Sequence, residues 1–221
     1  MYTVKKCFTP PALSAAWDSP DWSRAEVLSI AMPIVGVAAY KHNPQVACRL
    51  LHDDHHIYGL FQVHDRYVRC VTTKHNEQVC RDSCVEFFVE PPGGKGYFNF
   101  EFSGNGTTLL YHIREASLEK GISNFSPVSE EDVSDLEIFH TLPAIVDPPT
   151  DTPITWRLGF KIPLALFARQ TGTMPDFTQK WHANFYKCGG STEYKHWLTW
   201  QPLTVCNFHQ PDKFGKLTFE V

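Results

Sequence analysis

Apolar and polar residues alternate along much of the chain, and a period of two is typical of β-strands that bury one face. In residues 156–162, Trp, Leu, Phe and Ile side chains alternate with Arg, Gly and Lys. The same alternation occurs in residues 84–90, 97–103, 181–186 and 216–221. Further strands are predicted near residues 26–31, 46–51, 57–63, 67–72 and 107–113.

Helical signals are sparse. Residues 164–170, which follow Pro163 and are closed by Gly172, predict one short helix. Residues 129–136 predict a second helical turn, with Ser129 as its N-cap. About ten strands with one or two short helices predict an all-β fold, an antiparallel β-sandwich of the jelly-roll kind. We expect it to form a single domain over residues 1–221.

The net charge and the hydropathy of the chain argue against two classes of function. The formal net charge of −4 argues against a broad nucleic-acid-binding face. The longest apolar run, residues 30–40, is far shorter than a membrane span needs and contains Pro33 and Gly36. No secretory signal is recognisable, so a cytoplasmic location is expected for the chain as written, and an extracellular or periplasmic one if a leader has been removed. The oligomeric state stays open.

The seven cysteines are odd in number and scattered, which predicts free thiols. Cys80 and Cys84 lack the second pair that a zinc knuckle needs. Residues 52–56, His-Asp-Asp-His-His, have ligand types for a transition metal. They fall where a hairpin turn is expected, and turns are polar by default, so we favour a plain turn.

Two strands predict a polar sheet face with paired acids. If residues 84–90 and 97–103 pair through the loop 91–96, Phe88 faces Asn99 and Glu86 faces Glu101. Two carboxylates directly opposite each other repel. Compensation could come from a basic residue, a bound cation, a shared proton or the hydroxyls of a ligand, or the face could simply be solvated.

A second polar set lies toward the C-terminus. His182, Asn184 and Tyr186 project opposite the apolar residues of their strand. Trp197 and Trp200 are three apart, so a strand would place them on opposite faces. One can fill the core, while the other could offer its indole to the apolar face of a sugar ring, unless loops cover both.

Residues 82–86 read Asp-Ser-Cys-Val-Glu and open one of the predicted strands. They resemble the Asp-Ser-x-Val-Glu strand of carbohydrate-binding module family 9, within the DOMON-like β-sandwiches. The resemblance continues, in order, through residues 57–65, 97–107, 156–163, 181–187, 197–200 and 208–219. It implies a β-sandwich that binds polysaccharide ends or small sugars without cleaving them, and structural calcium in at least some members.

Carried over by position, the resemblance implies sugar-binding roles for several residues. Glu86 would accept hydrogen bonds from sugar hydroxyls, and Trp200 would form an aromatic wall. The full set of expected ligand-binding residues is Glu86, Asn99, Glu101, Asn184, Tyr186, Trp197 and Trp200. Val79 stands where sugar-binding members carry a tryptophan, Asn99 where they offer an arginine, and Lys187 where an arginine is usual. The site could therefore be one-sided, reshaped or lost.

We expect a non-catalytic carbohydrate-binding protein whose partner is a saccharide rather than a nucleic acid or a membrane. The main alternative is a glycoside hydrolase that uses Glu86 and Glu101, because residues facing each other across a ladder approach the carboxyl separation of retaining enzymes. A sandwich that has lost sugar binding is the other alternative. Calcium, if present, is expected to be structural, and we predict no other cofactor.

Overall fold

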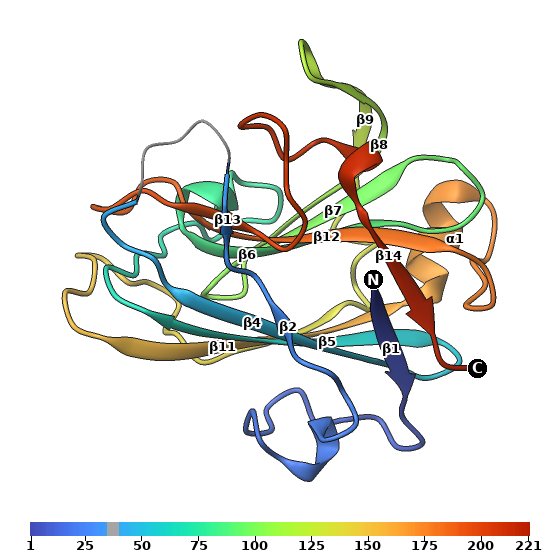
Figure 1. Ribbon diagram of the computed structural model, residues 1–221, viewed down its shortest axis with the longest axis horizontal. Coiled ribbons are helices and arrows are strands. Elements are labelled where there is room, and N and C mark those ends of the chain that lie inside the picture. Colours follow the sequence, from blue (N-terminus) through green and yellow to red (C-terminus); the bar gives the residue numbers. More distant parts are fainter. Residues whose placement is uncertain (35–39) are drawn as a thin grey trace.

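The computed structural model describes residues 1–34 and 40–221, which form two packed β-sheets (Figure 1). The upper sheet of Figure 1 has the strand order β14-β12-β6-β7-β8-β9, and β13 pairs with β12 and the short β3. The lower sheet has the order β10-β11-β5-β4, with β2 against β4. β1 joins the two sheets, because it pairs in parallel with both β14 and β4.

The strands are β1 (Tyr2–Lys6), β2 (Leu28–Ser29), β3 (Met32–Pro33), β4 (Gln45–His52), β5 (His56–Asp65), β6 (Ser83–Glu90), β7 (Tyr97–Ser103), β8 (Thr108–Ser117), β9 (Gly121–Pro127), β10 (Glu137–His140), β11 (Ile154–Pro163), β12 (Trp181–Gly189), β13 (Trp197–Thr199) and β14 (Gly215–Phe219). The helices are the α-helix α1 (Leu164–Thr171) and three 3₁₀ turns, η1 (Pro20–Trp22), η2 (Val79–Arg81) and η3 (Pro211–Lys213). In its described part, the structure contains no helix with the length and hydrophobicity of a transmembrane segment.

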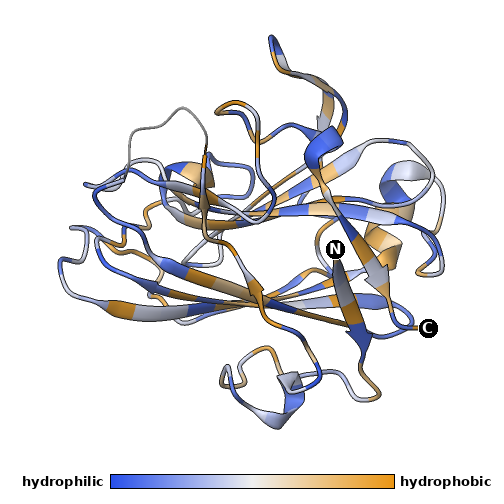
Figure 2. Cartoon of the chain, viewed as in Figure 1, coloured by the Kyte–Doolittle hydropathy of each residue, from blue (hydrophilic) through white to orange (hydrophobic). Residues whose placement is uncertain are grey.

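The predicted all-β sandwich is confirmed, and alternation explains its core. Apolar side chains of both sheets pack together between the layers, and hydrophilic and hydrophobic residues alternate along the strands (Figure 2). Phe87 of the upper sheet stacks on Phe160 of the lower sheet, with ring centroids 5.7 Å apart, and on Phe185 of β12 at 5.0 Å. These fully buried rings fix the spacing of the two layers.

Several local predictions are confirmed. Glu86 lies opposite Glu101, and Phe88 lies opposite Asn99. The predicted helix forms as α1 and ends at Gly172, whose φ of 71° is the left-handed conformation that glycine adopts at little cost. All seven cysteines are free.

The predicted second helical turn forms a hydrogen-bonded turn and no helix. The Ser129 hydroxyl accepts a hydrogen bond from the Asp132 N–H at 3.1 Å, as expected for an N-cap. The Val133 N–H closes one turn on the Ser129 carbonyl at 3.2 Å, and the chain then enters β10.

The strand predicted for residues 67–72 is wrong. Tyr67 has a φ of 58°, and Cys70 makes only an isolated bridge to Val146. The N–H groups of Val71 and Thr72 donate to the Asp82 carboxylate rather than to a neighbouring strand. The predicted strand at residues 26–31 shrinks to β2, which has two residues.

Candidate functional site

The outer face of the upper sheet carries the paired acids. Glu86 of β6 lies between Glu101 of β7 and Tyr186 of β12. Residues 200–214, which connect β13 to β14, cover part of this face and pack Leu203, Phe208 and Phe214 over the sheet. The acids thus lie at the edge of a covered region, and both are almost completely buried, with 1% of Glu86 and 7% of Glu101 exposed.

Glu86 has one satisfied and one unsatisfied carboxylate oxygen. The Cys188 thiol donates to its Oε1 at 2.9 Å, and the Cys84 thiol approaches the same oxygen at 3.9 Å. Burial, and then the Glu86 charge, raise the pKa of both thiols, so they remain protonated donors. Among the described residues, Oε2 of Glu86 has no hydrogen-bond partner. A buried carboxylate oxygen without a donor is costly, so burial disfavours the ionised form of Glu86.

Asn99 orients the second acid. Its Nδ2 donates to Oε1 of Glu101 at 2.8 Å, and its Oδ1 accepts a hydrogen bond from the Tyr111 N–H at 2.8 Å. With both ends of the amide engaged, Asn99 cannot turn easily. Its role in the site is therefore to position Glu101.

Burial and mutual repulsion oppose ionisation of the two acids. Burial, and then the charge of Glu101, raise the pKa of Glu86 well above its ordinary value. Burial raises the pKa of Glu101 to about 7. Two like charges this close do not both ionise readily, so the pair keeps one proton where isolated carboxylates would keep none. A retained proton gives the floor of the site both a hydrogen-bond donor and acceptors.

Partly exposed aromatic residues surround this floor. Tyr111, Trp197 and Phe208 pack against a small buried cluster that contains Cys84 and Cys188. Trp197 lies directly opposite Cys188 in the ladder, so both side chains occupy the outer face. Apolar rings beside a polar floor suit the mixed surface of a sugar, whose C–H groups pack on rings while its hydroxyls seek polar atoms.

Two expected site residues lie on the correct face but under the 200–214 connection. Asn184 is fully buried, and its Oδ1 accepts hydrogen bonds from the N–H groups of Phe185 and Gln201, both at 2.9 Å. Tyr186 is also fully buried, stacks on Phe208 with centroids 4.1 Å apart, and donates to the Phe208 carbonyl at 3.0 Å. Both residues hold the covering segment in place.

Trp200, expected as an aromatic wall, lies elsewhere. It packs against the interior cluster, with its ring 5.6 Å from that of Phe185 and close over Gly215. The Trp200 N–H binds the Phe185 carbonyl after β13 has ended, which turns the side chain inward. The structure therefore brings together Glu86, Asn99 and Glu101, places Trp197 on the same face beside Cys188, and leaves Trp200 apart from them.

Sequence reasoning missed four residues of the site. Tyr111 was in a predicted strand whose alternation assigns it a face, and the short turn at residues 104–107, which contains Gly104 and Gly106, is the local signal that could have paired that strand with β7. Phe208 lies in a segment without periodicity, so no sequence signal placed it there. Cys84 shares the outer face of β6 with Glu86, which period two indicates, whereas the Cys188 thiol meets Glu86 because β6 and β12 are neighbours.

The polar turn at residues 52–56 is a hairpin turn, as we favoured. Asp53 accepts hydrogen bonds from the N–H groups of His55 and His56, at 2.7 and 2.6 Å, and from the Tyr58 hydroxyl at 2.7 Å. Within residues 1–34 and 40–221, no three His, Cys, Asp or Glu side chains are grouped to hold a metal ion.

The acidic side chains do not fit calcium as they are arranged. Asp82 has one buried oxygen without a partner, but Arg69 and Arg81 line the same hollow, and their positive charges oppose a cation. Asp65 is already neutralised, because the buried ammonium of Lys187 lies 3.3 Å from its Oδ2. No side-chain calcium site can be assigned in the described part of the chain.

A family model described as carbohydrate-binding family 9 matches residues 22–219. Comparison with curated proteins found no match. Among solved structures, the chain is similar to a proposed carbohydrate-binding protein from Bacteroides uniformis, with a TM-score of 0.81 and 29% identity, covering 99% of this chain and 98% of that one.

Two further similar structures are of a family 9 carbohydrate-binding module from Caldicellulosiruptor kristjanssonii. The complex with cellotriose has a TM-score of 0.62 at 13% identity and covers 99% of this chain and 93% of that one. The complex with glucose has a TM-score of 0.62 at 12% identity, with coverage of 99% and 95%. At these identities the likeness establishes a shared fold.

Proposed function

The chain belongs to carbohydrate-binding family 9, and from this premise we propose that it binds a saccharide, without cleaving it, on the floor formed by Glu86 and Glu101. The observation that carries the site is the buried Oε2 of Glu86, which lacks a partner among the described residues. A sugar hydroxyl donating to this oxygen would satisfy it. Trp197, Tyr111 and Phe208 would pack against the C–H faces of the ring.

The proton that the acid pair keeps favours a neutral ligand. A carboxylate pair that keeps a proton can accept from one hydroxyl and donate to another, which matches the dual character of a sugar. An anionic ligand would face the remaining negative charge, and no basic side chain hydrogen-bonds either acid in the described residues. Glucose and cellotriose, the ligands of the Caldicellulosiruptor module, are therefore suitable first probes.

Glycoside hydrolysis is not favoured. The family is a non-catalytic binding module. In addition, the two carboxylates lie side by side on one sheet face, and a thiol occupies Oε1 of Glu86. A hydrolase needs carboxyl groups on two sides of the scissile bond.

Titration calorimetry with glucose, cellotriose and other short neutral saccharides tests the proposal. The wild-type protein is expected to release heat with at least one of them. Trp197→Ala is expected to weaken that binding tenfold or more, because truncating a central aromatic anchor usually has an effect of this size. Phe8→Ala, which removes a ring that is 83% exposed, is the matched control and should bind normally.

Melting curves of both variants confirm that they are folded. Undiminished affinity of Trp197→Ala would refute the assigned site. Absence of heat with every saccharide would favour a sandwich that has lost sugar binding.

Calcium binding is implied by the family resemblance alone and is untested. From the arrangement of the acidic side chains, we expect EDTA to leave the melting temperature unchanged. A calcium ion present at a concentration 100 times its Kd would raise the free energy of unfolding by about 2.7 kcal/mol. In a chain of this size, that corresponds to a rise in melting temperature of about 5–10 °C. A fall of that size with EDTA, reversed by added CaCl₂ but not by MgCl₂, would contradict our expectation and establish a calcium site.

A further inference from the structure

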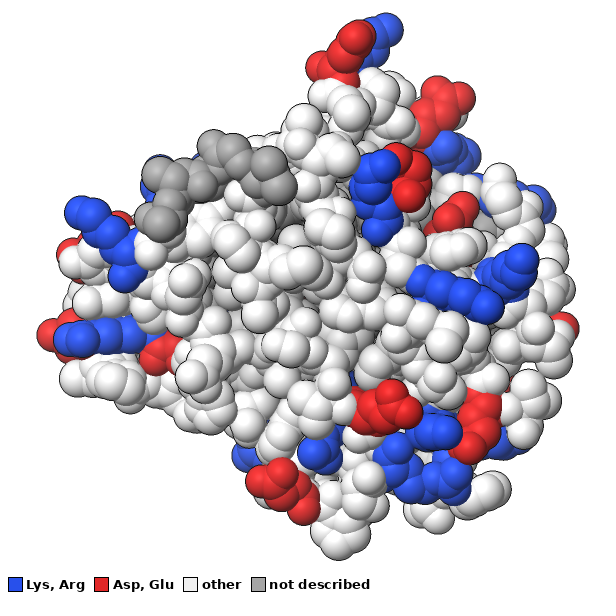
Figure 3. All heavy atoms as spheres, in the orientation of Figure 1, with Lys and Arg blue, Asp and Glu red and all other residues white. Residues whose placement is uncertain are grey.

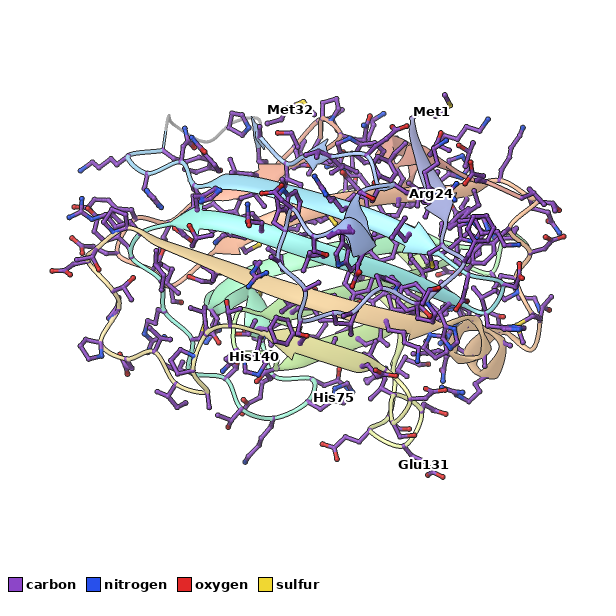
Figure 4. The ribbon with its side chains drawn as sticks, turned by 90° about the horizontal axis from the view of Figure 1, so that it is seen from below. Met1, Arg24, Met32, His75, Glu131 and His140 are labelled. Atoms are coloured by element: carbon purple, nitrogen blue, oxygen red, sulfur yellow. The ribbon has the colours of Figure 1, made fainter. Side chains whose placement is uncertain are left out.

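A separate hollow of about 520 Å³ lies along the lower sheet, away from Glu86. Its polar lining comes from Ser29 of β2, Gln45 of β4, Gln62 and His64 of β5, and Asn43 before β4. Trp17, from the N-terminal segment between β1 and β2, closes one wall. Figure 4 views this sheet from below, where β4, β5 and β11 lie side by side with their outward side chains.

Strand register makes these residues a continuous surface. Ala47 of β4 lies between Ser29 and Gln62, and in the next row Gln45 lies opposite His64, which lies opposite Thr155 of β11. Residues two apart share a face, so both rows point outward. The small side chain of Ala47 leaves room between its polar neighbours.

The hollow continues beyond β5. A second hollow of about 510 Å³ shares Asn43, Gln45 and His64 with the first and reaches Pro153 and Thr155. Together they form a groove that crosses β4, β5 and β11, which we call the lower-sheet groove. Each hollow alone lies within the size range of small-molecule sites, so the groove has room for more than one sugar unit.

His64 of the groove is hydrogen-bonded to the Thr155 hydroxyl at 2.7 Å, but four other polar side chains are unused or nearly so. Within the described residues, the side chains of Ser29, Asn43 and Gln45 make no hydrogen bond, and Gln62 has only a 3.4 Å contact to His64. Amides offer donors and acceptors together, which is what vicinal hydroxyls require. These groups lie at an exposed surface where a ligand can reach them.

Trp17 is held as a fixed aromatic wall. The Arg49 guanidinium lies 4.6 Å from its ring centroid and donates to the Trp17 carbonyl at 3.1 Å. Trp17 is half-buried against the cluster that contains Trp22 and Tyr58. A ring fixed in this way loses little conformational entropy when a ligand packs on it.

The charge of the groove selects the ligand class. The first hollow is lined by no Lys, Arg, Asp or Glu, and Figure 3 shows a broad area without such residues over β2. In the second hollow, Asp65 is buried in its pair with Lys187, and Arg66 lies at the far end. A neutral ligand rich in hydroxyls fits this lining better than a nucleotide or a charged peptide.

We propose that the lower-sheet groove is a second saccharide-binding site, which takes a neutral oligosaccharide with one unit against Trp17 and the next units across Gln62 and His64. The groove is separate from the Glu86 site: its polar residues lie on or beside the lower sheet, and Leu198 of β13 is the lining residue that comes from the upper sheet. A protein with both sites could hold two glycan chains, or two segments of one chain.

Titration with cellohexaose, xylohexaose and mannohexaose tests the second site in a background where the first is disabled. Trp197→Ala is expected to keep one binding event per chain with at least one of these sugars. Adding Gln62→Ala or Trp17→Ala to that background is expected to weaken it tenfold or more. Gln62→Ala tests the groove independently, in case loss of Trp17 disturbs the fold. Phe8→Ala is the control.

The outcomes separate the two proposals. If Trp197→Ala alone abolishes all heat, the lower-sheet groove does not bind sugar and the Glu86 site stands. If wild-type binding is unaffected by Trp197→Ala but lost with Gln62→Ala, the groove is the site and the Glu86 assignment fails. If the wild-type protein binds none of the sugars in either experiment, both proposals fail.

Discussion

Replacing Lys187 with methionine is expected to lower the free energy of unfolding by about 3–5 kcal/mol, the usual cost of removing one partner of a buried ion pair. The side chains of Lys187 and Asp65 are both fully buried. Without the ammonium, the Asp65 carboxylate would remain between the sheets with no countercharge from Lys187. For a chain of this size, the melting temperature should fall by about 6–20 °C.

The contacts of Lys187 explain why the loss is large. Its Nζ donates to the Cys188 carbonyl at 2.6 Å and lies 3.0 Å from Nε2 of His196. Burial, followed by the Lys187 charge, lowers the pKa of His196 to about 3. The His196 imidazole therefore stays neutral and can accept a hydrogen bond from the Lys187 ammonium. Burial opposes ionisation of Asp65, but Lys187 and a 2.6 Å hydrogen bond with His42 outweigh it and lower the pKa of Asp65.

Thermal melts compare Lys187→Met with Lys161→Met, which breaks the more exposed Lys161–Glu137 pair and should cost no more than about 1 kcal/mol. Adding Asp65→Asn to Lys187→Met should recover part of the loss, because the uncompensated charge is then removed as well. Equal losses for the two lysine variants would show that the buried pair does not stabilise the fold.

Glu101→Gln is expected to stabilise the protein more at pH 8 than at pH 5. Glutamate in the unfolded chain ionises near 4.5, whereas burial raises the pKa of Glu101 in the folded protein to about 7. Between these values the folded state keeps a proton that the unfolded state has released, so stability falls as pH rises. The difference between the folded and unfolded pKa values of Glu101 corresponds to about 3 kcal/mol in the free energy of unfolding, or about 6–12 °C in melting temperature.

The measurement is the difference between melting temperatures of Glu101→Gln and the wild type at each pH. Buried histidines change stability with pH in the opposite direction in the acidic range, because burial lowers the pKa of His209 to about 4. Both proteins contain these histidines, so subtracting the two melting temperatures removes their contribution. Glu119→Gln, an exposed change, is the control and should alter the melting temperature little at either pH. A difference that does not change with pH would mean that the pKa of Glu101 is not raised in the folded protein.

Alternation alone determined which side chains share a face in the main strands. It gave the β-sandwich, the opposition of Glu86 and Glu101 across the hairpin, and the inward direction of residues such as Phe87 and Phe160. These features depend on neighbours two residues apart or on one short turn, and such information is local. The helix end at Gly172 was predictable for the same reason.

Tertiary structure decided what happens to the outward side chains. The 200–214 connection buries Asn184 and Tyr186, whereas Trp197 remains half-exposed beside Cys188, and Trp200 turns inward once β13 has ended. Tyr111 joins the site from β8, the strand that follows β7, and Phe208 joins it from a connection far away in sequence. Period two states only that a side chain leaves the core face; whether water, a covering loop or a ligand meets it depends on long-range packing that no local pattern encodes.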